Sequence, residues 1–582
     1  MKISRVKIKN YRNLKNIDIE LANVVTVIGG NNCGKSNFLR AITLPLSSED
    51  GTGYSKRLTW YDFNDDAKKE YYEYLHDNKE KILAGEITCD EFAAHLPVIS
   101  IQLSILSEEN EHYDIKNILC DENGQWVGGI LYRFYTDKAE EILSIVSEMM
   151  NTETDDKAIK MSLLPTELYT YSITVPGKNQ RIPYDILSAF RSVVLAAERD
   201  NFASSADKLG SKALADALQK ELSSEAKVRI EKKYNEFFET VKAEGKLDEI
   251  LNWQEYSDIE HAKEFFEEIS VLPNMPPMSS IIGSVRLGYE DENMFMQGLG
   301  YRNLILVTVM LNSFLGGIND YSLRVVTVEE PEAHLCVNNE LLMASLFLKF
   351  SEKAKRTQII YSTHSTEFVN KVGLDKVVLL HNGTAINLGE AIDETERDYL
   401  AANPNTDIFK LLYSRKAIMV EGITEELLIK SYLQKNPTLN DIKVFSFHKG
   451  FRKIIEIWKS INKDTNNRLG IVRDFDNQPK AQKDHEEEIT DKVLICTTSE
   501  YTLEPEMVKA GNNFTVLKQH YGDVYGWQDM SEDELADHWR ESKSDVMLRI
   551  CHDLVDGNLS GFTLPNHIQS ILDFIQGEPD AD

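Results

Sequence analysis

The chain has 582 residues, of which 42% are hydrophobic and 27% are charged. This length exceeds what one hydrophobic core supports, so we expect about three or four structural units. The six cysteines include no C-x-x-C pair, which argues against a zinc module and against a disulfide framework. No apolar run is long enough to span a bilayer, and the first residues lack the layout of a signal peptide. We therefore expect a cytoplasmic protein without a membrane partner.

The formal net charge of −30 bears on the class of partner. Proteins that bind DNA usually present a basic face, because contacts to phosphates supply most of the non-specific affinity. Two interpretations stay open at this point. Either nucleic acid is not the partner, or it is bound through a local basic strip and through metal ions.

The first predicted elements are strands over residues 2–9 and 18–27, and the second strand runs into a glycine-rich loop followed by an amphipathic helix. The loop matches the P-loop pattern G-x-x-x-x-G-K-S. In such a loop backbone N–H groups surround a polyphosphate, the lysine reaches the β and γ phosphates, and the serine hydroxyl binds Mg²⁺. The predicted contacts to ATP and its Mg²⁺ are Gly29, Asn31, Gly34, Lys35, Ser36 and Asn37.

The middle of the chain changes character near residue 200. Strands are predicted at residues 98–106, 170–175 and 191–199, and then residues 206–246 contain helix formers with apolar positions at helical spacing and no proline. We interpret this segment as a helical hairpin inserted between two halves of an ATPase. Contact with a partner surface and packing against its own domain are equally good explanations for its apolar positions.

The second half of the nucleotide site is predicted downstream of Arg324. An apolar strand there ends in the paired carboxylates Glu329 and Glu330. A P-loop enzyme needs one acid for the Mg²⁺ shell, here Glu329, and one to orient the attacking water, here Glu330. His364 follows the next buried strand, where it can meet the γ phosphate.

The last part of the chain alternates strands and helices. Buried strands end at Val420 and Val472, and they deliver Glu421-Gly-Ile-Thr-Glu425 and Asp474-Phe-Asp476. Parallel strands place their carboxyl ends at one edge of a sheet, so these acids are expected to converge although they are far apart in sequence. Several carboxylates stay ionised together only with cations between them, which predicts a Mg²⁺ or Mn²⁺ site.

These motifs resemble two known modules. Residues 1 to about 395 resemble the ATPase heads of the family of structural-maintenance-of-chromosomes proteins, Rad50 and RecF, in which a glycine motif of one subunit closes over the ATP of another. The corresponding segment, Gln297 to Asn303, keeps its glycines but lacks the usual serine. Residues after about 410 resemble Toprim domains. That resemblance implies Glu504 as an extra acidic ligand and Lys543 as a catalytic lysine, although a plain surface helix explains Lys543 nearly as well.

An ATPase head with an insertion followed by a Toprim unit is the arrangement of the OLD family of nucleases, and the length and order are similar to the nuclease subunits of Gabija anti-phage systems. The expected fold is α/β, with an ABC-type ATPase head and a Rossmann-like Toprim domain. Its expected parts are the head with the P-loop (1–200), a helical insertion for dimerisation (201–280), the rest of the head (281–400) and the Toprim domain with C-terminal helices (401–582). Glu425 departs from the aspartate found in many relatives, so the metal geometry is expected to differ.

The resemblance implies a nucleotide-regulated DNA endonuclease with a two-metal site. Glu421, Glu425, Asp474, Asp476 and Glu504 would hold Mg²⁺ or Mn²⁺, Glu421 being either a ligand or a general acid or base. Double-stranded DNA would also contact the basic strip His448 to Lys453. The other expected partners are further copies of the chain, as a dimer or tetramer, and a helicase-type protein encoded alongside. The alternative is an ATP-switched DNA-binding or scaffold protein without nuclease activity.

Overall fold

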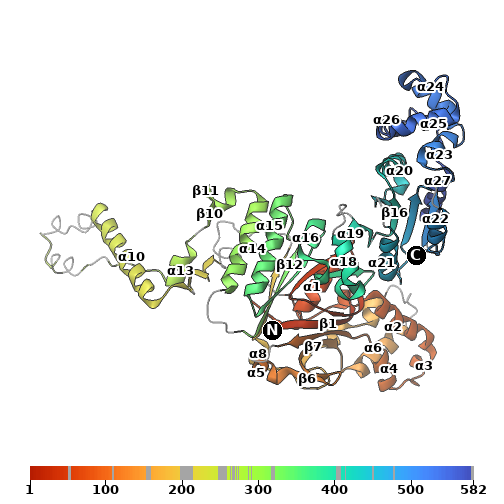
Figure 1. The fold of residues 1–582 in the computed structure, drawn as a ribbon. Coiled ribbons are helices and arrows are strands. Elements are labelled where there is room, and N and C mark those ends of the chain that lie inside the picture. Colours follow the sequence, from red (N-terminus) through yellow and green to blue (C-terminus); the bar gives the residue numbers. More distant parts are fainter. Residues whose placement is uncertain are drawn as a thin grey trace. The chain divides into compact units, whose positions relative to one another are not determined.

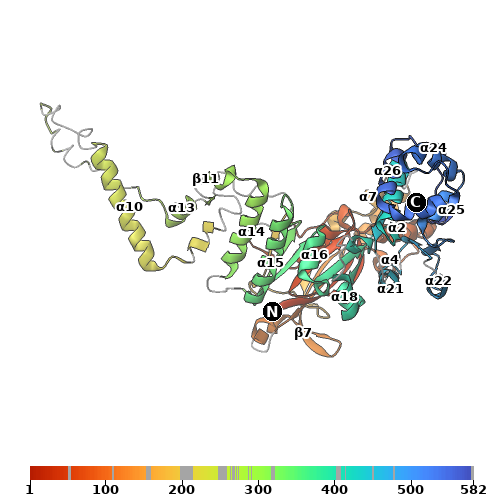
Figure 2. The same ribbon diagram turned by 45° about the horizontal axis from the view of Figure 1, so that its top comes forward.

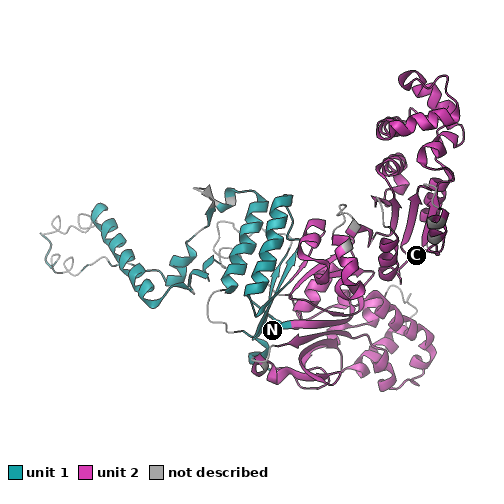
Figure 3. Cartoon of the chain, in the orientation of Figure 1, with its two compact units in different colours: residues 1–2, 46–53, 183–359 teal, residues 3–45, 54–182, 360–582 magenta. Residues whose placement is uncertain are grey.

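The structure is a computed structural model (Figures 1 and 2). It divides into two compact units (Figure 3). It describes residues 1–49, 54–107, 111–151, 159–196, 214–215, 217–219, 221–246, 258–261, 264, 269, 272, 274–285, 287–289, 292–315, 321–401, 408–412, 414–447, 451–463, 465–475 and 479–577. Unit 1 comprises Met1–Lys2, Leu46–Gly53 and Pro183–Ile359. Unit 2 comprises Ile3–Pro45, Tyr54–Ile182 and Ile360–Asp582.

Unit 2 begins with an antiparallel sheet whose strands run in the order β2-β1-β5-β7-β6, with β8 also paired to β7. Its strands are β1 (Lys2–Tyr11), β2 (Leu14–Glu20), β5 (Ile99–Leu106), β6 (Leu119–Glu122), β7 (Gln125–Tyr135) and β8 (Thr170–Thr174). Side chains in β1 alternate, so that Val6 and Ile8 are buried while Lys7 and Lys9 face away from the core. The buried face packs against aromatic residues such as Phe63, whose ring lies 5.7 Å from that of Phe134.

The helices that cover this lobe include α2 (Asp65–Asp77), α4 (Cys89–His95) and α6 (Ala139–Met150) (Figure 1). Asn64 begins α2, because its side chain accepts a hydrogen bond from the Asp66 N–H. Tyr71 of α2 and Phe92 of α4 are fully buried, with ring centroids 6.3 Å apart. The lobe therefore has a hydrophobic side under helices and a charged sheet face opposite to it.

The strand that leads into the P-loop lies in a second, largely parallel sheet. Within unit 2 its order is β15-β14-β3-β13, with the strands β3 (Val24–Gly29), β13 (Thr357–Ser362), β14 (Val377–His381) and β15 (Thr384–Asn387). All six residues of β3 are buried, as expected for a strand covered on both faces. The strand stops at Gly29, and α1 (Lys35–Thr43) starts after a five-residue loop.

In unit 1 the strand order is β13-β12-β9-β4. Strand β13 contributes residues to both units. The others are β4 (Ser47–Ser48), β9 (Phe190–Leu195) and β12 (Leu323–Glu329), and they carry the helices α14 (Leu299–Leu315) and α15 (Val337–Lys353). Arg324 of β12 is 2% exposed and donates two hydrogen bonds of 2.7 Å to Glu49. Its guanidinium also lies 4.2 Å from the ring centroid of Phe314, so this buried charge is fully paired.

Of the expected helical hairpin, the structure describes mainly the C-terminal part. Helix α10 (Ser224–Glu244) begins at Ser223, whose hydroxyl accepts from the Ala226 N–H, and it has no buried residue. Residues 201–213, which contain the start of the expected hairpin, lie outside the described residues. The two-helix form of the insertion and the domain limits expected from the sequence stay predictions.

The C-terminal part of unit 2 is a parallel sheet in the order β17-β16-β18-β19. Its strands are β16 (Lys416–Val420), β17 (Lys443–Ser446), β18 (Arg468–Arg473) and β19 (Val493–Thr497). In β16, Ile418 and Val420 belong to one hydrophobic core and Ala417 and Met419 to another. After Lys416, the strand is therefore apolar from Ala417 to Val420, because both faces of the sheet are covered.

Helices on the two faces supply the rest of these cores. One core includes residues of α20 (Ile423–Lys435), α26 (Lys543–Val555) and α27 (Asn566–Gln576), and the other includes α21 (Phe451–Ile461) together with Ile28 and Val377 of the head sheet. The α/β class and the alternating strands and helices predicted here are confirmed. Among the described residues, every helix is too short or too polar to cross a membrane.

Candidate functional site

The P-loop needs glycine at two positions for reasons that the structure makes explicit. Gly29 has φ 149° and Gly34 has φ 107°, both in the region that side chains rarely adopt. A Cβ on Gly29 would lie 2.4 Å from the carbonyl oxygen of Leu380, and one on Gly34 would lie 2.7 Å from Asn13 Oδ1. Neighbouring chain therefore sets the path of the loop before any phosphate is bound.

Lys35 lies across this loop. It is 8% exposed, and its Nζ donates to the carbonyl oxygens of Gly29 (3.1 Å) and Gly30 (3.0 Å). Ser36 and Asn31 are exposed at the surface of the loop. The ammonium group is thus held at the mouth of the loop, where it can exchange carbonyl partners for phosphate oxygens.

Two residues that the sequence reasoning missed connect the loop to the antiparallel lobe. Arg12 donates to Asn37 Oδ1 (2.9 Å) and to Asp62 Oδ1 (2.9 Å). Asn13 accepts from Asn37 Nδ2 (2.8 Å) and donates to the Asn32 carbonyl oxygen (2.9 Å). The Asn37 side chain is thus turned toward this network. The tight turn between the first two strands, where Arg12 has φ 49°, was the signal that could have indicated it.

His364 follows β13, the neighbour of β3, so it lies at the same sheet edge as the end of β3. It is exposed, and the preceding Thr363 donates its N–H to the carbonyl oxygen of Val27 at 3.0 Å. The other two predicted residues, Glu329 and Glu330, belong to unit 1, where Glu329 ends β12 and Glu330 adopts φ 44°. A left-handed glutamate is strained and is often found at functional sites. Their position relative to the P-loop stays a prediction.

The segment expected to close over a second ATP lies at the start of α14. A Cβ on Gly300 would lie 2.3 Å from the carbonyl oxygen of His334, and Asn303 Nδ2 donates to the Ala333 carbonyl oxygen at 3.1 Å. This glycine is therefore required by close packing against the turn that follows Glu330. That packing accounts for the glycine without any contact to nucleotide.

The C-terminal sheet carries a cluster of acids at the carboxyl ends of its strands, which we call the acidic edge (Glu421, Glu425, Asp474 and Glu504). Glu421 follows β16, Asp474 follows β18, and the other two lie in the first turns of α20 and α23 (Leu503–Lys509). The Asp474 N–H donates to Glu421 Oε2 at 3.2 Å, which joins the two strand ends directly. The convergence predicted from the alternating pattern is thus present for this pair.

Two members of the acidic edge are almost completely buried. Glu425 is 4% exposed and Glu504 is 1% exposed. Each accepts a hydrogen bond from a neighbouring threonine: Thr424 Oγ1 lies 3.1 Å from Glu425 Oε2, and Thr502 Oγ1 lies 2.6 Å from Glu504 Oε2. These threonines fix the carboxylates in place.

Glycine is required next to one of these carboxylates. A Cβ on Gly422 would lie 2.8 Å from Glu425 Oε2, so a larger residue would displace the carboxylate. The glycine of the E-G-x-x-E pattern therefore leaves the space that the carboxylate of the last glutamate in this pattern occupies.

Lys543, at the start of α26, is the cation of the acidic edge. Its Nζ lies 3.1 Å from Glu504 Oε1, and its side chain is 40% exposed. One carboxylate oxygen of Glu504 thus accepts a hydrogen bond from Thr502, and the other pairs with a lysine that is also partly exposed to solvent. The predicted lysine and the predicted extra acid are brought together, although 39 positions separate them in the chain.

Burial and mutual repulsion shift the proton equilibria of the acidic edge. Burial, followed by the charges of Glu425, Glu421 and Glu504, raises the pKa of Asp474 to about 8, while Lys543 acts in the opposite direction. Burial also raises the pKa of Glu425, with a smaller contribution from Glu504. A divalent cation bound among these carboxylates would relieve both effects, and carboxylate oxygens are the ligand type that Mg²⁺ and Mn²⁺ take.

The comparisons with known proteins assign the first part of the chain to a family. Residues 1–369 match the family model described as "AAA ATPase domain". The chain belongs to this family. Membership accounts for the P-loop, since an ATPase domain binds ATP together with Mg²⁺.

Two relatives of this AAA ATPase chain bear the name "Endonuclease GajA", and both are from Bacillus cereus. The one from strain HuB5-5 is 28% identical over 188 residues, which are 27% of this chain and 27% of that protein. The one from strain VD045 is 20% identical over 446 residues, which are 75% of this chain and 68% of that protein. This chain thus spans about a quarter of the first relative and about two thirds of the second. The predicted resemblance to an ATPase–nuclease of the Gabija type is confirmed.

Among solved structures, the chain is similar to a crystal structure of an Smc head bound to the C-winged helix domain of ScpA. The alignment covers 67% of this chain and 100% of that chain at 13% identity, with a TM-score of 0.31.

Some predicted site residues of this AAA ATPase family member are not settled by the structure. Asp476 and the residues His448 to Gly450 of the basic strip lie outside the described residues. In the part of the chain that is described, no group of three or more His, Cys, Asp and Glu side chains is arranged closely enough to hold a metal ion. The metal ligand set therefore stays a prediction.

The described cations of the basic strip are paired with acids. Lys453 Nζ lies 2.8 Å from Glu396 Oε1, and Arg452 Nε lies 3.5 Å from Glu488 Oε1. A charge that already has a carboxylate partner contributes less to phosphate binding, because the partner has to be displaced or stays nearby as a repelling charge. The strip is thus a weaker candidate for DNA contact than its sequence indicates.

Proposed function

We propose that the chain is an ATP-regulated, metal-dependent endonuclease that cleaves double-stranded DNA. The observation that carries the proposal is the acidic edge with Lys543 at the carboxyl ends of a parallel sheet. Buried carboxylates with raised pKa values beside one cation are typical of functional sites rather than of structural ion pairs. The family match adds the nucleotide-binding half, and the GajA relatives are named as endonucleases.

Glu421, Glu425, Asp474 and Glu504, with Asp476, would hold Mg²⁺ or Mn²⁺. When bound, two such ions lower the pKa of a water molecule and stabilise the leaving oxygen of a phosphodiester. The chain's own contributions are to hold the carboxylates in register through Gly422, Thr424 and Thr502, and to offer a positive charge. Lys543 is partly exposed and would turn from Glu504 to a phosphate oxygen, where it stabilises the developing negative charge.

Nucleotide control would start at the P-loop. ATP would draw Lys35 away from the carbonyl oxygens of Gly29 and Gly30, Ser36 would bind the Mg²⁺ of the nucleotide, and His364 would meet the γ phosphate. Glu329 and Glu330 would complete this site with the metal and water roles. The P-loop strand and the C-terminal sheet share one hydrophobic core through Ile28 and Met419, which offers a packed route between the two sites.

The active form would be a homo-oligomer, a dimer or tetramer, in which α10 contributes to self-association. Val228, Phe237 and Val241 of this helix are 51%, 63% and 46% exposed, respectively. Two catalytic units in one assembly can cut both strands of a duplex. By likeness to GajA, the biological role would be anti-phage defence, with a helicase-type partner.

The proposal is tested by incubating purified protein with supercoiled plasmid and Mg²⁺ or Mn²⁺, with EDTA as the control. Cleavage that disappears with EDTA and in Asp474→Ala, but persists in Asp441→Ala, supports it; Asp441 is a surface acid of the same part of the chain, paired with Lys416 at 2.9 Å. DNA binding without cleavage under all metal conditions would instead support an ATP-switched DNA-binding or scaffold protein. Light scattering on the same preparation measures the mass, and a value near 66.4 kDa would contradict the oligomer.

A further inference from the structure

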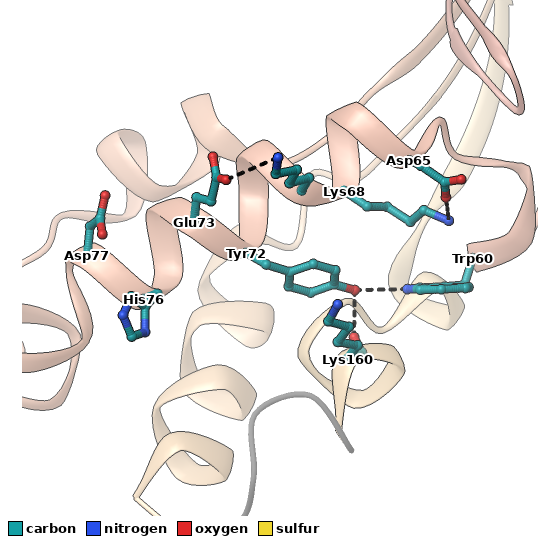
Figure 4. A pocket seen from close by; sticks show the side chains of 9 residues that line it. Trp60, Asp65, Lys68, Tyr72, Glu73, His76, Asp77 and Lys160 are labelled. Atoms are coloured by element: carbon teal, nitrogen blue, oxygen red, sulfur yellow. Dashed lines mark hydrogen bonds and ion pairs between the residues drawn. The ribbon is translucent and has the colours of Figure 1, made fainter. Parts of the chain in front are cut away.

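Two hollows in the antiparallel lobe of unit 2 differ in the charges of the residues that line them. The first, of about 750 Å³, lies between the turn at Trp60, α2 and the region of Lys160 (Figure 4). Its lysines are offset by equal numbers of acids: Lys68 pairs with Asp65 at 2.8 Å, and Lys69 pairs with Glu73 at 3.8 Å. Its aromatic groups are bonded to one another, since Trp60 Nε1 donates to the Tyr72 hydroxyl at 2.9 Å. This hollow offers no unbalanced charge to a ligand.

The second hollow has a volume of about 680 Å³ and a different composition. We call it the basic pocket and define it by the charged and polar residues that line it. These are Lys9, Asn10, Lys15, Asn16, His95, Ser100 and Arg133, with Glu70 as the acid among the lining residues. In a chain with a net charge of −30, a concave surface with three cations and one acid is an exception to the general composition.

The strand order explains how these cations come together. Lys9 is on β1 and pairs in register with Asn16 of β2, while Arg133 is on β7 and pairs with Ser100 of β5. Strand β5 lies between β1 and β7, so Lys9 and Arg133 arise about two strand spacings apart, roughly 10 Å. That distance lets two long side chains contact different phosphates of one backbone.

The charge of the sheet face changes along β1. At one end Arg5 donates to Asp18 at 2.6 Å, and Lys7 lies 3.6 Å from Glu122, so these cations are neutralised. Two residues further along, Lys9 is exposed and forms no ion pair among the described residues. Arg133 is likewise exposed, and its guanidinium lies 5.1 Å from the ring centroid of Tyr135 rather than beside a carboxylate. Lys15, the third cation of the basic pocket, pairs with Asp66 at 2.7 Å. The unneutralised charge of the basic pocket is therefore carried by Lys9 and Arg133.

We propose that the basic pocket binds the phosphate backbone of double-stranded DNA and is a second DNA contact besides the acidic edge. The proposal rests on the proposed function, because it assigns a further contact to the same substrate. Cations without carboxylate partners are those that gain most from phosphates, since each contact releases counterions and none has to break an ion pair first. Asn16 and Ser100 add neutral hydrogen-bonding groups of the kind that accompany phosphate contacts. The contact is independent of DNA sequence.

The test measures binding of a fluorescent duplex to the full-length protein in EDTA, where cleavage is stopped, over a range of salt concentrations. The variant is Lys9→Gln with Arg133→Gln, and the matched control is Lys69→Gln, an exposed lysine of the first hollow that already has a partner. We expect about tenfold weaker binding for the double variant, and a decrease of about 2 in the slope of log affinity against log salt, as for two lost phosphate contacts. The control is expected to bind as the wild type does.

Unchanged affinity and slope in the folded double variant would overturn the proposal while leaving the proposed function intact. A second measurement adds inorganic triphosphate as a competitor of the duplex. If the double variant no longer responds to triphosphate but binds the duplex with unchanged affinity, the proposal is also overturned, because the pocket then binds a small phosphate compound. Failure of the wild-type protein to bind any duplex would overturn the inference and the proposed function together. Both glutamine substitutions are at exposed strand positions, and a thermal melt equal to that of the wild type confirms that the variant is folded.

Discussion

The P-loop and the acidic edge both lie at the carboxyl ends of parallel strands in unit 2, yet they are built in opposite ways. The P-loop takes its shape from consecutive residues, and two glycines with positive φ allow the backbone itself to be the binding surface. The acidic edge takes four carboxylates and a lysine from five places that span Glu421 to Lys543. A local site is held by backbone geometry, whereas a dispersed site is held by packing and by neighbouring hydroxyls.

The difference also decides what each site does with its charge. Lys35 is held by two carbonyl oxygens, which are dipoles that it can leave without creating an unpaired charge. Glu425 and Glu504 are buried carboxyl groups, and burial together with the charge of Glu504 raises the pKa of Glu425 in spite of the nearby Lys543. We therefore expect changes in the acidic edge to have larger effects than changes in the loop.

The largest effect is expected for Asp474→Ala. Removing the carboxylate that is influenced by the charges of three other carboxylates should lower DNA cleavage by at least about 100-fold, as removal of a key charge-stabilising group does in other enzymes. Nucleotide binding should be unchanged. A gel assay on plasmid and a fluorescent ATP analogue measure the two properties, and cleavage at the wild-type level by the folded variant would contradict the assignment.

In the P-loop, Lys35→Ala should weaken ATP binding by about 10- to 100-fold, the value of a lost charge-assisted hydrogen bond. Glu330→Ala should bind ATP normally and turn it over slowly, because its expected role is toward water rather than phosphate. Calorimetry gives the affinities, and phosphate release gives the turnover. Equal loss of ATP binding in both variants would show that Glu330 has a different role.

A smaller effect is expected for Gly422→Ala. The added methyl group would lie 2.8 Å from Glu425 Oε2 and should displace that carboxylate, which lowers Mn²⁺ affinity by about tenfold, as changes around metal ligands do. Gly283→Ala is the matched control, because an added Cβ there has open space around it. Titration calorimetry with Mn²⁺ alone measures the difference, and equal affinities in the two variants would mean that Glu425 is not a ligand.

The smallest expected effect is a dependence of metal binding on pH. Because the pKa of Asp474 is raised from 3.8 to about 8, the folded metal-free protein keeps a proton that the unfolded chain has lost. Its stability should therefore fall as pH rises from about 4 to about 8, and bound Mn²⁺ should cancel this fall by replacing the proton. Thermal melts at pH 6 and pH 8 should show a larger stabilisation by Mn²⁺ at pH 8. In Asp474→Asn this difference between the two pH values should shrink.

Much of the fold was predictable because its signals are local. Strands β3, β16 and β18 have mainly apolar, buried interiors, since both faces of their sheets are covered. Strand β3 ends in Gly29, and the acids Glu421 and Asp474 directly follow β16 and β18. The P-loop could be read from eight residues because phosphate binding by backbone needs glycines at fixed positions. The limits of the insertion could not be read in this way, since helix-forming residues with apolar spacing do not reveal what the helix contacts.

The sequence by itself determined the α/β class and the P-loop, and it predicted Glu421, Glu425 and Asp474, because each of these depends on residue type and short spacing. Glu504 and Lys543 were predicted from the resemblance to Toprim domains. Only the tertiary structure decided that Arg12 and Asn13 bond to Asn37, that Lys543 pairs with Glu504, and that Arg452 and Lys453 are neutralised while Lys9 is not. The physical reason is that a charge takes its effect from the groups within a few ångströms of it, and those groups come from other strands and helices.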